Sequence, residues 1–275
     1  MIKVSSMEAH KLARVYEKEV APHWEGHFVP FLLESFPAEL PRKATLLEMC
    51  CATGDLTAEI AARLPEGGRL IAVEDVRELM DLARAKIPAD MRKRVFFKKE
   101  QPNALTFADE TYQGVLSPGL PTVYDLADVL AEAVRLLGKD GFVLLGALLS
   151  GSFQELLDIY REVLEKEDLV AAQDNLDSFC GKLPDPPAAN RMLSAAGLIE
   201  CRARARTVSI HFENGLGLIR SPLVRRHCLE ECLGFIKDRG WREGVLAGIV
   251  RSLDTYFPKG LDLTLVLGRL EGVKL

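Results

Sequence analysis

The sequence predicts an α/β protein with a Rossmann-like, doubly wound and mostly parallel sheet, an antiparallel edge strand and a helical cap. Short apolar runs alternate with segments of helical periodicity between residues 44 and 150. A turn of small residues, Cys50 to Asp55, joins the first apolar run to the first helix. Strands that alternate with helices pair in parallel through right-handed crossovers. The chain has 275 residues, which is enough to bury a full core around such a sheet.

The segment 44–150 supplies the parallel part of the predicted sheet. Its strands are apolar runs bounded by Gly, Pro and charged residues, as buried strands are. They are Ala44 to Met49, Arg69 to Glu74, Arg94 to Lys98, Gly114 to Ser117 and Gly141 to Gly146. The helices between them, recognised by apolar spacing of three and four residues, are Leu56 to Leu64, Glu78 to Lys86 and Tyr124 to Leu137.

The rest of the chain predicts helical caps and two last strands within a single domain, 1–275. An N-terminal cap, 1–43, contains helices between residues 7 and 36 that Pro22 interrupts. Two further cap insertions are 151–197, with helices at 152–166, 169–180 and 186–196, and 216–257, with helices at 216–237 and 241–256. The last two strands are 198–212 and 261–268, and we expect them to pair antiparallel at the sheet edge.

Composition excludes several classes of protein. The net charge of -5 and the pI near 5.7 argue against binding to nucleic acid, which needs a basic face. No apolar run reaches the roughly 18–20 residues that cross a bilayer, and the charged N-terminus lacks the apolar region of a signal peptide. We therefore expect a cytoplasmic protein with six reduced cysteines. The sequence contains no convincing metal site, because Cys228 and Cys232 lack a second pair of ligands.

The turn from Leu46 to Thr57 contains the residues Glu48-Met-Cys-Cys-Ala-Thr-Gly-Asp-Leu-Thr. It resembles motif I of the class I S-adenosylmethionine-dependent methyltransferases, and the Cys-Cys pair followed by x-Thr-Gly-Asp is especially similar to the ubiquinone and menaquinone methyltransferase branch. The resemblance implies that Glu48 accepts a hydrogen bond from the amino group of the cofactor's methionine part. It also implies that Cys50, Ala52 and Gly54 pack against the methionine and ribose parts. Cys50 and Ala52 replace two glycines of the family pattern.

Further acids fall at family distances from this turn. Glu74 ends the second predicted strand, where a carboxylate can accept hydrogen bonds from both ribose hydroxyls, and Asp75 is the competing candidate. For the adenine position, one alignment puts Gln101 at the acid, followed by Pro102, which has no N–H to donate. The alternative puts Glu100 at the acid with Gln101 as the N–H donor. Ser117, at the end of the fourth strand, completes the cofactor-binding residues that the resemblance implies.

The caps supply candidates for the acceptor side, although no catalytic residue is identified. Tyr16 and Trp24 are expected to pack the N-terminal cap over the cofactor cleft. Arg202, Arg204 and Arg206 alternate with small residues, so strand periodicity places them on one face. They form either a docking patch for an acidic partner or the solvated face of an edge strand, which charges protect from aggregation.

Two functions remain open. The first is transfer of a methyl group from S-adenosylmethionine to a small, partly apolar acceptor, with S-adenosylhomocysteine as the product. The second is a catalytically inactive relative that serves as a cofactor-binding or regulatory module. Ala52 and Gln113, which replaces an acid common in the family, favour this second hypothesis. An NAD-dependent oxidoreductase is disfavoured because the chain lacks the Gly-x-Gly-x-x-Gly turn.

Overall fold

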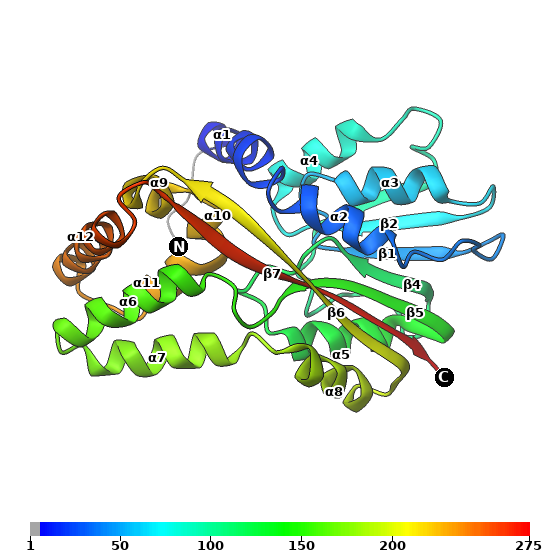
Figure 1. Cartoon of the computed structure of the whole chain (residues 1–275). Helices are drawn as coiled ribbons and strands as arrows, with labels where there is room; N and C mark the ends of the chain where they lie inside the picture. The colour runs from blue at the N-terminus through cyan, green and yellow to red at the C-terminus, as the bar shows by residue number, and fades with distance from the viewer. Residues whose placement is uncertain (1–5) are drawn as a thin grey trace.

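The computed structural model describes residues 6–275, so residues 1–5 of the predicted N-terminal cap lie outside the described residues. The described chain forms a seven-stranded sheet in the order β3-β2-β1-β4-β5-β7-β6. Helices cover both faces of this sheet, and a group of helices extends beyond one end of it (Figure 1). The predicted fold class is confirmed.

The parallel strands are those that the sequence predicts, within a few residues at each end. They are β1 (Thr45–Met49), β2 (Arg69–Val73), β3 (Val95–Lys98), β4 (Tyr112–Ser117) and β5 (Leu137–Leu148). Leu46, Leu47 and Met49 of β1 have no exposed surface, because helices pack on both faces of this central strand. The crossover helices are α3 (Asp55–Arg63), α4 (Arg77–Lys86) and α5 (Leu126–Leu136). In Figure 1, α3 and α4 lie on the opposite side of the sheet from α5.

The last two strands, β6 (Leu198–Phe212) and β7 (Leu261–Lys274), pair antiparallel as expected. β7 lies between β5 and β6, and β6 forms the sheet edge. The predicted end of the final strand at Gly268 is wrong, because β7 pairs with β5 as far as Val273. Gly268 is a point of close packing rather than a terminus: a Cβ there would lie 2.8 Å from Cγ of Leu149.

The N-terminal cap consists of α1 (Ser6–Val15), the π-helical turn η1 (Tyr16–Val20) and α2 (Glu25–Leu33). The helices of the first insertion are α6 (Gln154–Lys166), α7 (Val170–Gly181) and α8 (Pro186–Ala195). α8 packs against β6 and β7, whereas α6 packs against the last cap helix, α12 (Arg239–Tyr256). One buried apolar cluster joins the N-terminal cap to the first insertion, and it includes Trp24, Phe153, Tyr160 and Phe179.

The predicted helix over 216–237 is wrong, because this segment is broken into α9 (Gly215–Arg220), α10 (Pro222–Val224), a second π-helical turn η2 (Arg225–Leu229) and α11 (Glu230–Gly234). The break comes from Pro222, which disfavours helical backbone at the residue before it. Ser221 is accordingly extended, with ψ of 124°. Among the helices of the described chain, none is both long enough and apolar enough to cross a membrane.

Candidate functional site

The turn between β1 and α3 has an unusual backbone. Cys50, Ala52 and Gly54 all have positive φ, at 55°, 45° and 87°. Non-glycine residues rarely adopt this left-handed conformation, and it costs about 1 kcal/mol or more at each such position. These are the positions where the motif calls for glycine. The turn therefore keeps the backbone of a glycine-rich loop, although side chains occupy two of its three glycine positions.

Gly54 is required for two independent reasons. It caps the N-terminus of α3 with left-handed backbone, which glycine adopts without steric cost. In addition, a Cβ at this position would lie 2.6 Å from Cβ and 2.7 Å from Cα of Ala83 in α4. The third glycine of the motif thus lets α3 and α4 pack closely beside the turn.

Glu48, in β1, lies fully buried next to the turn. Neither of its carboxylate oxygens has a hydrogen-bond partner among the described residues, and the same holds for the buried hydroxyl of Ser117 at the end of β4. Burial raises the pKa of Glu48 well above its ordinary value. A buried carboxyl group without partners is costly, and a cationic amino group is the kind of ligand that would satisfy it.

Glu74 follows β2 and lies beside the turn, as predicted. Its carboxylate accepts hydrogen bonds from the backbone N–H of Ala52 (2.9 Å) and of Val76 (3.1 Å). Burial and its neighbour Asp75 raise the pKa of Glu74 to about 7. A carboxylate has about four lone-pair sites, so Glu74 can still accept bonds from a ribose. Asp75 is engaged differently, because the hydroxyl of Tyr124 donates to it at 2.6 Å.

The N-terminal cap holds the turn through a buried acid that the sequence did not indicate. Glu25, at the start of α2, accepts hydrogen bonds from the hydroxyl of Thr53 (3.1 Å) and the backbone N–H of Asp55 (3.3 Å). Lys86 in turn pairs with Asp55 at 2.7 Å. Burial, together with the nearby charge of Asp55, raises the pKa of Glu25 to about 7. This acid had no motif to mark it, since its role depends on contact between distant segments.

A narrow cleft, named here the cofactor cleft, gathers several of the predicted residues. It is lined by Tyr16, Trp24, Cys50, Ala52, Glu74, Asp75, Pro118, Gly119, Pro121, Tyr124 and Arg226. The enclosed cavity measures about 10 Å³, which is about the room that one water molecule needs. Tyr16 and Trp24 from the N-terminal cap and Arg226 from η2 line this space, which is too small for the cofactor, so ligand entry requires cap side chains to move.

The predicted adenine residues lie outside the lining of the cofactor cleft. Glu100 accepts a hydrogen bond from the backbone N–H of Thr106 (2.9 Å) and pairs with Lys98, so it holds its own loop. Gln101 is exposed in the same loop. The role of either residue at the adenine stays a prediction. Arg226 and Tyr124, by contrast, line the cleft although the sequence did not single them out for it, because both are placed by cap and loop packing.

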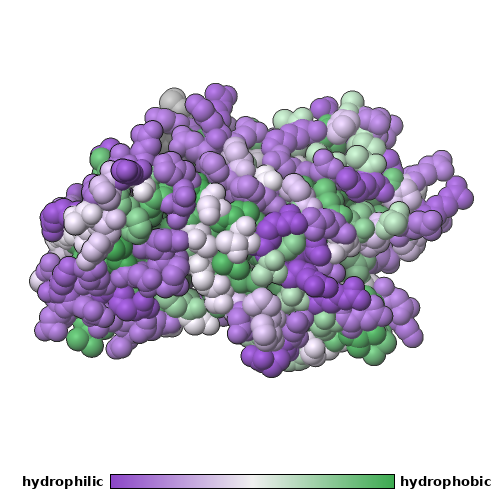
Figure 2. Space-filling model, in the orientation of Figure 1, coloured by the Kyte–Doolittle hydropathy of each residue, from purple (hydrophilic) through white to green (hydrophobic). Residues whose placement is uncertain are grey.

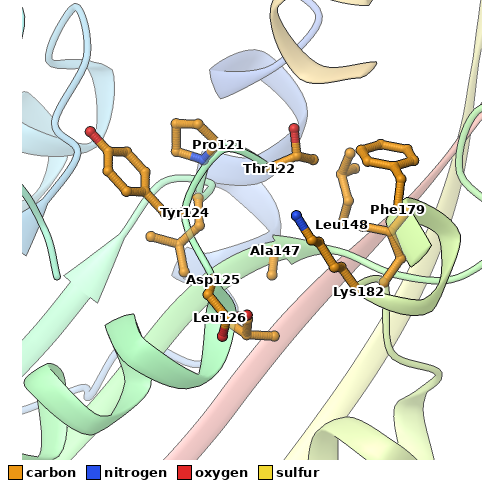
Figure 3. Close-up of a pocket in the computed structure, with 11 residues that line it drawn as sticks. Pro121, Thr122, Tyr124, Asp125, Leu126, Ala147, Leu148, Phe179 and Lys182 are labelled. Atoms are coloured by element: carbon orange, nitrogen blue, oxygen red, sulfur yellow. The ribbon is translucent and has the colours of Figure 1, made fainter. Parts of the chain in front are cut away.

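A second cavity, named here the loop pocket, lies at the carboxyl ends of β4 and β5 and shares Pro121 and Tyr124 with the cofactor cleft. Figure 3 shows Phe179 and Lys182 facing this loop from the opposite side, while the hydroxyl of Tyr124 points away from them. The enclosed cavity is small, about 30 Å³. Lys182 pairs with Glu231 at 2.9 Å, so the pocket's cation already has a partner.

The N-terminal cap and the second cap insertion, 216–257, meet in a stacked pair of rings beside these cavities. The rings of Trp24 and His227 lie 3.7 Å apart with an angle of 12° between their planes. Neither ring nitrogen of His227 has a hydrogen-bond partner in the described chain, although the residue is fully buried. Burial lowers the pKa of His227 well below its ordinary value, so the ring is neutral near pH 7.

The three arginines of β6 do not form a uniform patch. Arg206 pairs with Glu34 and lies over the ring of Phe31 at 4.3 Å, so it packs against the N-terminal cap. Arg202 and Arg204 are exposed. Figure 2 shows hydrophilic and hydrophobic side chains mixed near the middle of the molecule, where β6 and β7 overlap in the view of Figure 1. Docking of an acidic partner at these arginines stays a prediction.

Known proteins match the parallel half of the chain. Residues 46–141 match the family model of a methyltransferase domain. The 2-phytyl-1,4-naphtoquinone methyltransferase of Thermosynechococcus vestitus is 35% identical over 104 residues, which cover 38% of this chain and 45% of that protein. The demethylmenaquinone methyltransferase of Lactobacillus johnsonii is 33% identical over 99 residues, covering 35% and 41%. The chain thus matches less than half the length of these curated relatives.

Solved structures resemble the fold over most of the chain. The YcgJ protein of Bacillus subtilis has a TM-score of 0.55 at 14% identity, covering 90% of this chain and 98% of that one. A phosphoethanolamine N-methyltransferase 2 of Haemonchus contortus, solved with S-adenosyl-L-methionine, has a TM-score of 0.54 at 13% identity, covering 98% of this chain and 57% of that one. At such identities the likeness concerns the fold alone.

Proposed function

We propose, from the match of residues 46–141 to a methyltransferase domain and their similarity to quinone methyltransferases, that the protein transfers a methyl group from S-adenosylmethionine to a small, partly apolar acceptor. One observation carries the proposal. The left-handed turn at Cys50, Ala52 and Gly54 directly follows Glu48, whose carboxyl group has no partner among the described residues, and the N–H of Ala52 in this turn donates to the carboxylate of Glu74. The two acids would then serve as acceptors for the two polar parts of this cofactor.

The described residues fit the cofactor in their chemistry. Glu48 would accept from the methionine amino group, whose positive charge would favour the ionised form of this buried acid. Glu74 would accept from the ribose hydroxyls while it still holds the N–H groups of Ala52 and Val76. When bound, S-adenosylmethionine supplies a methyl group on a sulfonium centre, and the protein supplies placement and exclusion of water. Tyr16 and Trp24 would perform that exclusion from the N-terminal cap.

The position of the loop after β4 supports an acceptor site next to the cofactor cleft. The loop after β4, with Pro121 and Tyr124, separates the cofactor cleft from the loop pocket, so a ligand at this loop would reach both. The apolar lining from Leu148 and Phe179 favours an acceptor with an apolar body. The curated relatives named above are called naphtoquinone and menaquinone methyltransferases, so a reduced naphthoquinone is the first acceptor to assay.

A second function, a cofactor-binding module without turnover, is favoured by the closure of the cleft. Its cavity of about 10 Å³ lies under cap side chains, and Ala52 adds a methyl group where the family has glycine. In this alternative the cofactor stabilises one arrangement of the caps and no acceptor enters.

Calorimetry with S-adenosylmethionine and S-adenosylhomocysteine tests the proposal. We expect both to bind, and we expect Glu74→Ala to weaken binding at least about 100-fold, since two charge-assisted hydrogen bonds are lost. Glu78→Ala, at an acid of α4 outside the lining of the cleft, is the matched control and should bind as the wild type does.

The outcomes separate the two functions. Absence of binding at millimolar cofactor would contradict both. Binding that Glu74→Ala abolishes, followed by methylation of a reduced naphthoquinone or another apolar acceptor, would support the methyltransferase. Binding of the same kind with no transfer to any member of an acceptor panel would favour the module.

A further inference from the structure

A large apolar groove adjoins the cofactor cleft. Its walls come from α1, η1, the start of α4 and the α10–η2 segment, and its volume is about 380 Å³. Leu12, Ala13, Val20 and Leu79 contribute apolar side chains to it. Leu12 is 59% exposed, so one end of the groove opens to solvent. The groove is therefore far larger than either the cofactor cleft or the loop pocket.

The groove has a single charged side chain among its described lining residues, that of Arg226. The guanidinium of Arg226 lies 5.2 Å from the centre of the Tyr16 ring. The described chain gives it no carboxylate within ion-pair distance, whereas the adjacent Arg225 pairs with Glu230. A guanidinium offers five N–H donors in a planar arrangement that suits a carboxylate or a phosphate. Arg226 thus supplies a free anion-binding group at an apolar wall.

The groove and the cofactor cleft are neighbours with a shared boundary. Tyr16 and Arg226 line both spaces. A ligand whose chain lies in the groove therefore ends beside the cofactor cleft, at Arg226. A ligand chain that fills the groove also displaces water from the guanidinium of Arg226. An anionic group on the ligand compensates the lost hydration, whereas a neutral group does not.

We propose that this groove binds the apolar chain of the methyl acceptor and that Arg226 binds an anionic group at the end of that chain. The acceptor class is then a single-chain anionic amphiphile, and the proposal rests on the methyltransferase function proposed above. A carboxylate and a phosphate share the required chemistry.

Calorimetric titration with octanoate, decanoate and dodecanoate, below their micelle concentrations and with S-adenosylhomocysteine present, tests the groove. Each added CH₂ group that enters an apolar groove should tighten binding about fourfold. 1-Decanol supplies the same chain without the charge, and we expect it to bind at least about tenfold more weakly than decanoate. Decyl phosphate distinguishes a phosphate head from a carboxylate head.

Two variants locate the site. Arg226→Gln should weaken decanoate at least about tenfold and remove its advantage over 1-decanol, whereas Arg225→Gln, at the neighbouring paired arginine, should change neither. Leu12→Glu, at a position where the side chain is 59% exposed, should weaken binding at every chain length and repel the anion. Equal binding of decanoate and 1-decanol, or insensitivity to Arg226→Gln, would overturn the proposal.

The test is independent of the proposed function. Cofactor binding without any binding of the amphiphiles would overturn the groove proposal and leave the methyltransferase intact. Loss of cofactor binding would appear in the titrations with S-adenosylhomocysteine alone. If Leu12→Glu converts a dimer to a monomer in gel filtration, the groove is covered by a second copy of the chain, and the proposal fails.

Discussion

The cofactor core, 44–150, and the helical caps differ in how tightly their residues are packed and paired. In the core, a buried β1 and close packing of Gly54 on Ala83 fix a strained turn in one conformation. In the caps, a π-helical turn carries the guanidinium of Arg226 and the imidazole of His227, neither of which has an ionic or hydrogen-bond partner for its side chain among residues 6–275. The family match covers 46–141 and so falls within the core.

This difference suits a core that binds the cofactor common to the family and caps that select the acceptor. The turn keeps the left-handed backbone of a glycine-rich loop even where Cys50 and Ala52 stand at glycine positions, as we expect if it holds the proposed cofactor. The caps would face the proposed acceptor, and they carry two groups, the guanidinium of Arg226 and the imidazole of His227, without hydrogen-bond partners in the described chain. Substitutions in the core should therefore affect folding and cofactor together, whereas cap substitutions should affect selectivity and pH response.

Gly54→Ala, in the core, should have the largest effect among the substitutions that test this contrast. The methyl group would lie 2.6 Å from Cβ of Ala83, and the backbone has φ of 87°. Overpacking and left-handed strain together should lower the free energy of unfolding by about 3 kcal/mol or more. Urea denaturation followed by circular dichroism measures this loss.

The matched control for that substitution is Gly244→Ala in the cap helix α12. No atom lies within 4 Å of a Cβ at that position, so we expect a gain of up to about 1 kcal/mol from higher helix propensity. If Gly54→Ala costs no more than Gly244→Ala, the turn is not tightly constrained and the contrast between core and caps fails.

The same contrast explains what sequence could and could not predict. Glu48, Gly54 and Glu74 were found from a motif and its distances, because β1 and β2 place them by local rules. Tyr124 was predicted to begin a helix, yet it lies before α5 and donates to Asp75, which depends on how a loop folds back.

Cap residues escaped prediction because their roles arise from contacts between distant segments. Arg226 had no motif, and the helix expected over 216–237 would have placed it on a regular face. Pro222 was the one local signal that this helix breaks. The groove needs α1, α4 and η2 together, and no single window of sequence contains these three elements.

A cap substitution, His227→Phe, tests the same contrast through the pH dependence of the free energy of unfolding. Because the folded pKa of His227 is lowered, the unfolded chain binds a proton below pH 6.5 that the native chain does not. Stability from this residue is therefore lost as pH falls, by at most about 2 kcal/mol at pH 5. His227→Phe keeps a ring against Trp24, removes two unpaired nitrogens and should abolish this loss.

Urea unfolding of the wild type and of His227→Phe at pH 7.5 and pH 5.0 measures how the free energy of unfolding changes with pH in each protein. The difference between the two changes belongs to His227, because the other titrating groups are common to both proteins. His211→Phe, at an exposed histidine of β6, serves as the matched control. An unchanged pH dependence in His227→Phe would mean that this histidine finds polar partners in solution. The polar groups of the cap would then be hydrogen-bonded as fully as those of the core.

The smallest expected effect comes from restoring the family residue in the turn by Ala52→Gly. Relief of left-handed strain, about 1 kcal/mol, is offset by the greater freedom of glycine in the unfolded chain, so stability should change by less than about 0.5 kcal/mol. Removal of one methyl group widens the approach to the cleft, and we expect affinity for S-adenosylmethionine to rise by no more than about fivefold. Ala58→Gly, in the regular helix α3, should instead cost about 1 kcal/mol. An equal loss in both variants would show that Ala52 carries no strain, and the turn would then tolerate side chains because its backbone relaxes rather than because the core holds it in place.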